Sequence, residues 1–363
     1  MANTNLSAAK RAKQDEHYTQ WADIEREMNA YLEFNPDVFR DKTVLLPLGL
    51  DEAFELVTQP ARLRRWQTVA ARVDLKVGGE YRWTVTPGHH ASGTFTEVEP
   101  GKRVVFTWGW EQSDAPADNV STVAITFEPA DGGTNVRLVH EGLPTPEAVA
   151  AHSEGWNHYL DRLLAEAATG DAGADEWAAA PQDLNELSAA DATLAIVQRV
   201  LRGITAADLD RATPCSDFNV GRLLDHLAGS VANIGTALGA QVADDAGKAP
   251  EARIADLAQP TLEAFARRGL DGTVDMGFAE LPATMVASIL NLEFLVHAWD
   301  FAKALGLELT VADELTDYVE VLAQQTISDQ VRAGGSFAAP APVGESASSL
   351  ERLVAFTGRA VHA

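Results

Sequence analysis

The hydrophobic pattern changes its period partway along this chain, and that change constrains the fold more than any other feature of the sequence. Residues 42–142 carry short runs rich in β-branched and aromatic residues, such as 81–85 and 122–127. Turn-forming pairs such as Gly78-Gly79 separate these runs, a pattern typical of antiparallel hairpins. From Leu187 onward the apolar residues recur at helical spacing, so two different architectures follow one another.

This pattern also predicts where the parts of the chain begin and end. Residues 1–40 are expected to form a helical N-terminal extension, because their apolar positions lie three and four residues apart. Residues 41–168 are expected to form an α+β domain in which an antiparallel sheet is followed by a long C-terminal helix. The small and polar residues 169–182 form a linker, and residues 183–363 form an all-α bundle of four helices.

Start and stop signals place the helices of this second half. Two residue pairs have the spacing of capping boxes that begin helices: Ser188 with Asp191, and Thr205 with Asp208. A third helix is expected over residues 220–238. A fourth, strongly apolar helix is expected over residues 283–305, and Gly306 ends it.

The charge balance narrows the range of partners. Among 363 residues there are 28 Lys and Arg against 53 Asp and Glu, a formal net charge of −25. Such a surface repels phosphate groups, so we expect neither nucleic acid nor a membrane surface as a partner. No apolar run approaches the roughly 18 residues of a membrane-spanning helix, and the first residues lack the apolar stretch of a secretory signal. Cys215 is the single cysteine, which excludes an internal disulfide and favours a cytoplasmic location.

The segment Glu293-Phe294-Leu295-Val296-His297 is the sharpest chemical signal in the chain. Glu293 and His297 lie four residues apart and therefore share one face of an apolar helix. Burying an ionised carboxylate without a partner is costly, and a divalent cation removes that cost. His226, on another apolar helix, would complete a set of two histidines and one glutamate, the donor set of catalytic zinc sites. Asp300 could orient His297 by accepting a hydrogen bond from it.

Simpler interpretations of the same residues remain open. A Glu-x-x-x-His pair is often just a hydrogen-bonded pair, and a histidine on an apolar face is often part of the core. The donor set also suits non-haem iron, so zinc is the first candidate but the identity of the metal stays open. Cys215 precedes a helix, where a thiolate is favoured, but a small residue packed in the turn explains it as well.

Three segments in order carry a resemblance to a known family: 213–220, 223–227 and 293–302. Together they resemble the metal-binding domain of mycothiol-dependent maleylpyruvate isomerases and their DinB-like four-helix-bundle relatives, over roughly residues 183–363. The resemblance implies metal ligation by His226, Glu293 and His297, and activation of mycothiol or another low-molecular-weight thiol. The isomerases carry a further C-terminal domain, and the stretch after Val331 is too short for it, so the resemblance alone does not imply isomerase activity.

Aromatic residues dominate the β-rich half and predict either a ligand cavity or an ordinary core. A long helix laid over a curved sheet can leave a cavity between them. The residues expected to line it are Trp83, Phe95, Phe106, Trp108 and Trp156. The segments 77–81, 93–108, 133–136 and 152–160 resemble the START-like helix-grip (SRPBCC) family, in particular homologues of the heat-shock-protein ATPase activator. That resemblance implies a hydrophobic or aromatic small-molecule ligand. It implies no fixed catalytic residues, and none are assigned.

A third resemblance concerns residues 8–28 and 34–40, which are similar to the leading segment of EcoRI-type adenine-specific DNA methyltransferases. The chain lacks any Pro-Pro pair and hence the catalytic motif of such enzymes, so no methylation activity is implied. Two functions therefore stay open. The first is a metal-dependent transferase or isomerase, with mycothiol or another thiol as a candidate reactant and with a fused ligand-binding domain. The second is a non-catalytic small-molecule-binding or stress-response protein with a structural metal. The sequence does not indicate an oligomeric state.

Overall fold

The structure is a computed structural model that describes residues 41–111, 121–181 and 183–361. The helix predicted within residues 1–40 therefore lies outside the described residues. By its internal contacts the chain divides into two compact units. Residues 92–170 belong to the first, and residues 171–363 belong to the second together with 56–74 and 80–91. The domain boundaries expected from the sequence stay predictions.

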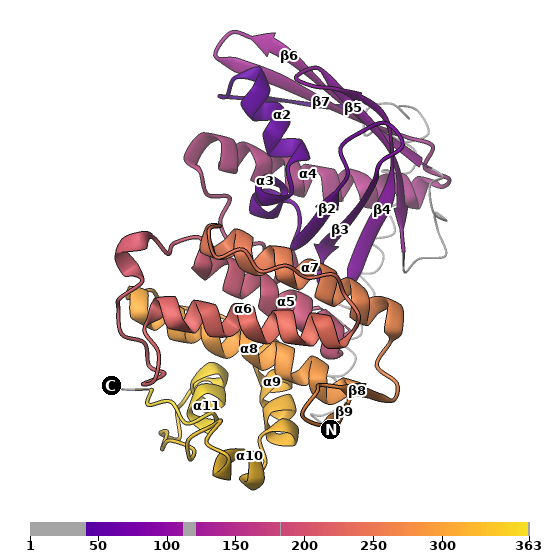
Figure 1. The fold of residues 1–363 in the computed structure, drawn as a ribbon. Helices are drawn as coiled ribbons and strands as arrows, with labels where there is room; N and C mark the ends of the chain where they lie inside the picture. Colours follow the sequence, from indigo (N-terminus) through magenta and orange to yellow (C-terminus); the bar gives the residue numbers. More distant parts are fainter. Residues whose placement is uncertain (1–40, 112–120, 182, 362–363) are drawn as a thin grey trace, which may run out of the picture. The chain divides into compact units, whose positions relative to one another are not determined.

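The first half forms a seven-stranded antiparallel sheet with helices (Figure 1). Along the sheet the strands lie in the order β1-β7-β6-β5-β4-β3-β2. In chain order the elements are β1 (Asp41–Leu46), α2 (Leu50–Thr58), α3 (Pro60–Trp66), β2 (Ala70–Val73), β3 (Glu80–Thr86), β4 (His89–Glu99), β5 (Arg103–Trp110), β6 (Ser121–Ala130), β7 (Gly133–Glu141) and α4 (Pro146–Thr169).

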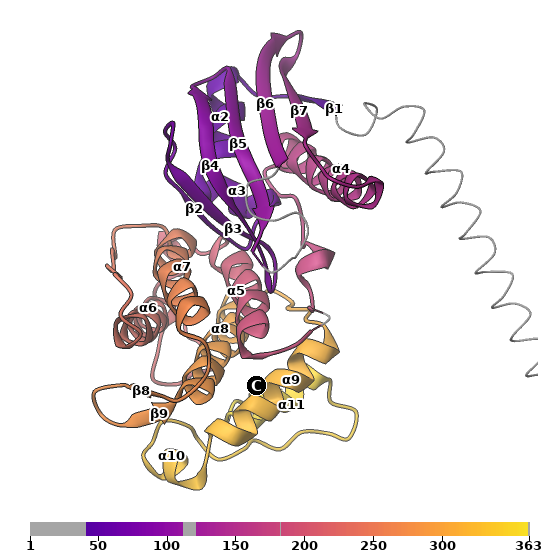
Figure 2. The ribbon, with the colours of Figure 1, turned by 90° about the vertical axis from the view of Figure 1, so that its right-hand side faces the viewer.

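Alternating burial explains why these segments form strands. In β6 every second residue from Ser121 to Phe127 is buried, so one face of the strand packs inward and the other does not. Helix α4 begins where the Thr145 side chain accepts a hydrogen bond from the backbone N–H of Ala148, and it ends at Gly170 in the left-handed conformation. Helix α4 lies beside the sheet (Figure 2). Its Trp156 packs against Trp108 of β5 and donates a hydrogen bond to His140 of β7. The predicted helix-grip architecture is confirmed.

The five aromatic residues predicted to line a cavity, Trp83, Phe95, Phe106, Trp108 and Trp156, are all buried. Ring centroids of Phe95 and Phe106 lie 5.8 Å apart, and those of Trp108 and Trp156 lie 5.4 Å apart, which is the packing of an aromatic core. His89 and His90 begin strand β4, because the turn before it is confined to Pro87-Gly88.

The second half is mostly helical. Its elements are η1 (Glu176–Ala178), α5 (Glu186–Leu201), η2 (Ala206–Asp208), α6 (Val220–Ala237), α7 (Pro250–Arg268), β8 (Thr273–Asp275), β9 (Glu280–Pro282), α8 (Ala283–Leu305), α9 (Asp313–Thr326), α10 (Asp329–Ala333) and α11 (Ser349–Phe356). Helix α5 packs against α7 and α8, and α6 packs against the same two helices, so these four surround one apolar core. Helices α9 and α11 pack against each other and against α8.

Helices α6 and α8 match their predicted ranges closely, but the other expected helices need correction. Helix α5 begins earlier than predicted, because its capping box is formed by Asn185 and Ser188 rather than by Ser188 and Asp191. The box of Thr205 and Asp208 is present, yet it starts only the short 3₁₀ turn η2. The fourth helix around the core is α7, which the sequence pattern did not indicate.

Helix α8 is long and apolar enough to pass a simple test for a membrane-spanning helix, judged by length and composition alone. However, 83% of its most apolar window is buried inside the structure. It is the central helix of the second half, in contact with α5, α6 and α9. Burial on nearly all sides explains its apolar sequence without a membrane.

Candidate metal centre

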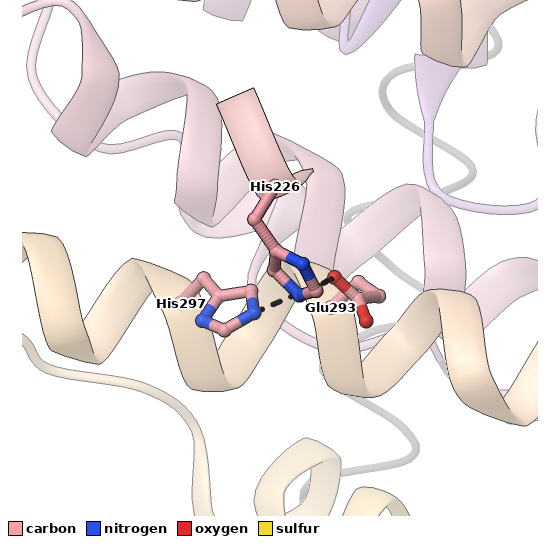
Figure 3. Close-up of side chains that lie close together, drawn as sticks. All are labelled: His226, Glu293 and His297. Carbon is pink, nitrogen blue, oxygen red and sulfur yellow. Dashed lines mark ion pairs between the residues drawn. The ribbon is translucent and has the colours of Figure 1, made fainter. Parts of the chain in front are cut away.

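Two helices bring three potential metal ligands together. Helix α8 carries Glu293 and His297 one turn apart, and helix α6 carries His226 (Figure 3). The Nε2 atoms of His226 and His297 each lie 3.4 Å from Oε2 of Glu293. One ligand atom from each of the three residues lies within 4.8 Å of the others. The two imidazole rings do not stack but meet edge to face, with centroids 5.2 Å apart. The Nε2 atom of each ring faces the Glu293 carboxylate.

The Glu293 carboxylate is the electrostatic centre of this cluster. Its Oε2 atom is buried and makes no hydrogen bond to any described residue, although two imidazole nitrogens lie beside it. Burial alone would raise the pKa of the Glu293 carboxyl, but the two histidines outweigh burial and lower that pKa to about 2. The carboxylate is therefore ionised at neutral pH and points at two imidazole nitrogens.

A second carboxylate fixes the ring of His297 from its other side. Nδ1 of His297 lies 2.9 Å from Oδ2 of Asp300, whose side chain is fully buried. Arg359 approaches the same carboxylate with two nitrogens: Nε lies 3.0 Å from Oδ1 and Nη2 lies 2.7 Å from Oδ2. Burial would lower the pKa of His297, but Asp300 and Glu293 outweigh it and raise that pKa to about 9 in the absence of an ion.

The exposed side of the cluster lies at His226. Its side chain is 38% exposed, against 16% for Glu293 and 8% for His297. The ring of Phe218, just before helix α6, stacks on His226 with centroids 5.2 Å apart. Cys215, in the same loop, is half-buried, and burial raises the pKa of its thiol. A raised pKa keeps the thiol protonated, which does not favour a nucleophilic role for Cys215.

The structure thus brings together the four residues that the sequence singled out here: His226, Glu293, His297 and Asp300. Sequence reasoning missed Arg359, which reaches Asp300 from 59 residues further along the chain. Neither spacing nor helical periodicity connects these two residues. The one available signal was an arginine next to a glycine, which is too common to select it.

A second cluster of polar side chains lies between α4 and the sheet of the first half. Nε1 of Trp156 donates to Nδ1 of His140, and Nε2 of His140 lies 3.0 Å from the hydroxyl of Ser121. Nε1 of Trp110 donates to Nε2 of His152. An indole nitrogen can only donate. Each of these two ring nitrogens therefore accepts, and both imidazoles are neutral in this arrangement.

Each half of the chain matches a known protein family. Residues 49–168 match the family "Activator of Hsp90 ATPase homolog 1-like protein", and residues 190–276 match "Mycothiol maleylpyruvate isomerase N-terminal domain". Residues 5–49 match "Adenine-specific methyltransferase EcoRI". The chain therefore carries an Hsp90-activator-like domain of the SRPBCC type followed by a mycothiol maleylpyruvate isomerase N-terminal domain. The three resemblances inferred from the sequence are confirmed.

Individual relatives extend these matches. An uncharacterized protein of Mycobacterium tuberculosis is 28% identical over 45% of this chain and 91% of its own length. The human activator of 90 kDa heat shock protein ATPase homolog 1 is 24% identical over 30% of each chain. The solution structure of an activator-like protein from Rhizobium etli is 36% identical over 40% of this chain and 91% of that one, with a TM-score of 0.33. Through its first domain the chain belongs to the Hsp90-activator-like family.

Proposed function

We propose that the helical unit binds one divalent metal ion through Nε2 of His226, Oε2 of Glu293 and Nε2 of His297, and that the protein is a metal-dependent enzyme of the transferase or isomerase type. Zinc is the first candidate, because two imidazoles and one carboxylate are common zinc ligands. Mycothiol or a similar thiol is the proposed second reactant, since the matching family is named for mycothiol.

One observation carries the proposal: a buried carboxylate oxygen without a hydrogen bond to any described residue faces two imidazole nitrogens, each 3.4 Å away. Tetrahedral bonds of about 2.1 Å would place neighbouring donor atoms about 3.4 Å apart. The spacing is therefore too long for a good hydrogen bond but matches that of donor atoms around a shared ion. Two of the three donor separations thus match a shared ion, and all three donor atoms lie within 4.8 Å of one another.

The donor set also fits catalysis rather than a purely structural role. Three protein ligands leave a position open, and the partly exposed His226 marks the side from which a small molecule would approach. A divalent ion bound here would lower the pKa of a coordinated thiol or water, making it a nucleophile at neutral pH. Asp300 would hold the His297 ring so that its Nε2 atom faces the ion.

The first domain is proposed to bind a hydrophobic or aromatic small molecule. The support is its SRPBCC-type fold, which typically holds such ligands, and the buried aromatic residues at the α4 side of the sheet. This domain would hold a substrate or product for the metal-dependent step. Mass spectrometry of small molecules that copurify with the protein tests this part, and the absence of any apolar ligand would remove its main support.

A non-catalytic protein is the second candidate, and the charge balance of the cluster favours it. Glu293 and Asp300 carry two negative charges, while a protonated His297 and Arg359 carry two positive ones. Such a network satisfies its own charges without an ion. On this view the first domain binds a metabolite, and the helical unit is a scaffold with a structural metal or none.

Metal analysis tests the proposed centre, and turnover that a chelator abolishes would separate an enzyme from a protein with a structural metal. Purified protein dialysed against Zn²⁺ should retain about one ion per chain, and His297→Ala should lose most of it, because the ion would keep only two protein ligands. His158→Ala, a histidine replacement in helix α4 of the other unit, should keep the full amount. If wild type and His297→Ala retained the same small amount of metal, the proposed centre would be wrong and the charge-balanced network would stand.

A further inference from the structure

We propose that Arg359 is a positioning residue for the metal centre, acting through Asp300 on His297. This inference rests on the proposed metal site and extends it to a residue at the far end of the chain. Three links connect them. Arg359 grips Asp300, Asp300 holds Nδ1 of His297, and Nε2 of His297 faces Glu293.

The grip on Asp300 is the strongest link in this series. Nε of Arg359 lies 3.0 and 3.2 Å from the two carboxylate oxygens, and Nη2 lies 2.7 Å from Oδ2. A guanidinium that contacts a carboxylate with two nitrogens fixes its rotation as well as its position. Since the Asp300 side chain is fully buried, it needs such a cation nearby. Arg359 supplies that charge, and the pKa of the Asp300 carboxyl stays low despite burial.

The backbone around Arg359 is itself held in one conformation. Gly358 adopts a φ of +94°, and a Cβ atom at that position would lie 2.7 Å from Cβ of Ala338. The backbone N–H of Arg359 donates to the carbonyl of Val354 in helix α11. Nη1 of Arg359 also donates to the Thr357 hydroxyl, 3.2 Å away. A turn tied to α11 thus aims the guanidinium at helix α8.

This arrangement predicts a function for the turn that follows helix α11. Arg352, in the same helix, pairs with Asp317 and Glu320 and has a side chain that is 43% exposed. The Arg359 side chain is only 9% exposed and points at the residue that orients a proposed ligand. Arg352 is therefore a matched control: an arginine in the helix that precedes Arg359, paired with carboxylates other than Asp300.

A double-mutant cycle on metal affinity tests the proposal. Zn²⁺ dissociation constants are measured by competition with a chelator for wild type, Arg359→Ala, Asp300→Asn, the double variant and Arg352→Ala. Loss of a group that orients a metal ligand typically weakens affinity about 10- to 100-fold. We expect Arg359→Ala to fall at the lower end of that range and Arg352→Ala to match wild type. Because Arg359 acts through Asp300, the double variant should be no more than about twofold weaker than Asp300→Asn alone.

The visible absorption of bound Co²⁺ gives a second reading that reports ligand geometry directly. It should change in Arg359→Ala and stay as in wild type for Arg352→Ala. If Arg359→Ala does not fold, Arg359→Lys takes its place, because lysine keeps the charge but cannot grip both oxygens. Multiplying effects in the double variant, or wild-type affinity and spectrum in the Arg359 variant, would overturn the proposal. Failure of wild type itself to bind Zn²⁺ would instead refute the proposed metal site.

Discussion

His152 in helix α4 has both ring nitrogens engaged: Nε2 accepts from the Trp110 indole and Nδ1 donates to the carbonyl of Ala148. Burial lowers the pKa of this imidazole, although the bond to Ala148 opposes the shift. The unfolded chain therefore binds a proton near pH 6.5 that the folded chain does not. The contribution of His152 to the free energy of unfolding should be constant above that pH and fall below it, by at most about 1.4 kcal/mol per pH unit.

Urea unfolding at pH 7.5 and pH 5.5 measures this effect. His152→Gln, which has no titratable group, should show a smaller loss of stability between the two pH values than wild type. His158→Gln is the matched histidine replacement on the same helix, where the ring of His158 contacts that of Tyr159. Equal losses in wild type and His152→Gln would contradict the assignment of a neutral imidazole.

Individual residues were predictable where the contact follows from regular geometry. Glu293 and His297 lie four apart on a helix, and Asp300 follows three residues later, so helical periodicity alone places them on one face. His226 could be chosen because few histidines lie on apolar helices. Arg359 could not be predicted, because it is joined to Asp300 only through the irregular path of residues 334–348. Such a path has no period that a sequence could display.

At the scale of the elements, the turn between β6 and β7 depends on one close approach. Gly133 has a φ of +155°, and a Cβ atom there would lie 1.9 Å from the backbone oxygen of Leu46 in β1. Gly133→Ala should therefore force β1 away from β7 and lower the free energy of unfolding by at least about 2 kcal/mol. The neighbouring Gly132 has a φ of +85° and open space around it. Gly132→Ala should cost only about 1 kcal/mol, the price of the left-handed conformation.

Chemical denaturation of the two glycine variants gives the comparison. Both replacements add the same methyl group to the same turn. The test is therefore whether Gly133→Ala lowers the free energy of unfolding more than Gly132→Ala does. If Gly132→Ala were as destabilising as Gly133→Ala, the contact with Leu46 would not be what selects glycine at position 133.

Elements with a strong periodic signal were predicted well, and elements without one were missed. The long helices α4, α6 and α8 each have a capping residue or a terminal glycine together with an apolar face, so several local preferences agree. Helix α7 contains Pro260, which normally ends a helix, and packing against α5 and α6 overrides that local preference. The short segments α3 and β2 are too brief to show a period at all.

For the whole molecule, the acidic surface and the buried cluster both affect how a divalent cation would bind. A net charge of −25 attracts divalent cations toward the protein at long range, and added salt weakens that attraction. Long-range attraction does not select one binding site, because exposed carboxylates stay hydrated and are alike in this respect. The cluster of His226, Glu293 and His297 is set apart by burial and by converging donor atoms rather than by charge.

If the proposed ion binds only the folded chain, it must stabilise the fold by mass action. Free Zn²⁺ at 100 times its dissociation constant should raise the free energy of unfolding by about 2.7 kcal/mol, and a chelator should reverse the gain. Thermal unfolding with increasing Zn²⁺ measures this, and in His297→Ala the midpoint should not move. Mg²⁺ is the control for simple screening of the acidic surface, because it prefers oxygen ligands. A rise in midpoint that Mg²⁺ reproduced, or that His297→Ala retained, would assign the effect to surface charge and not to this centre.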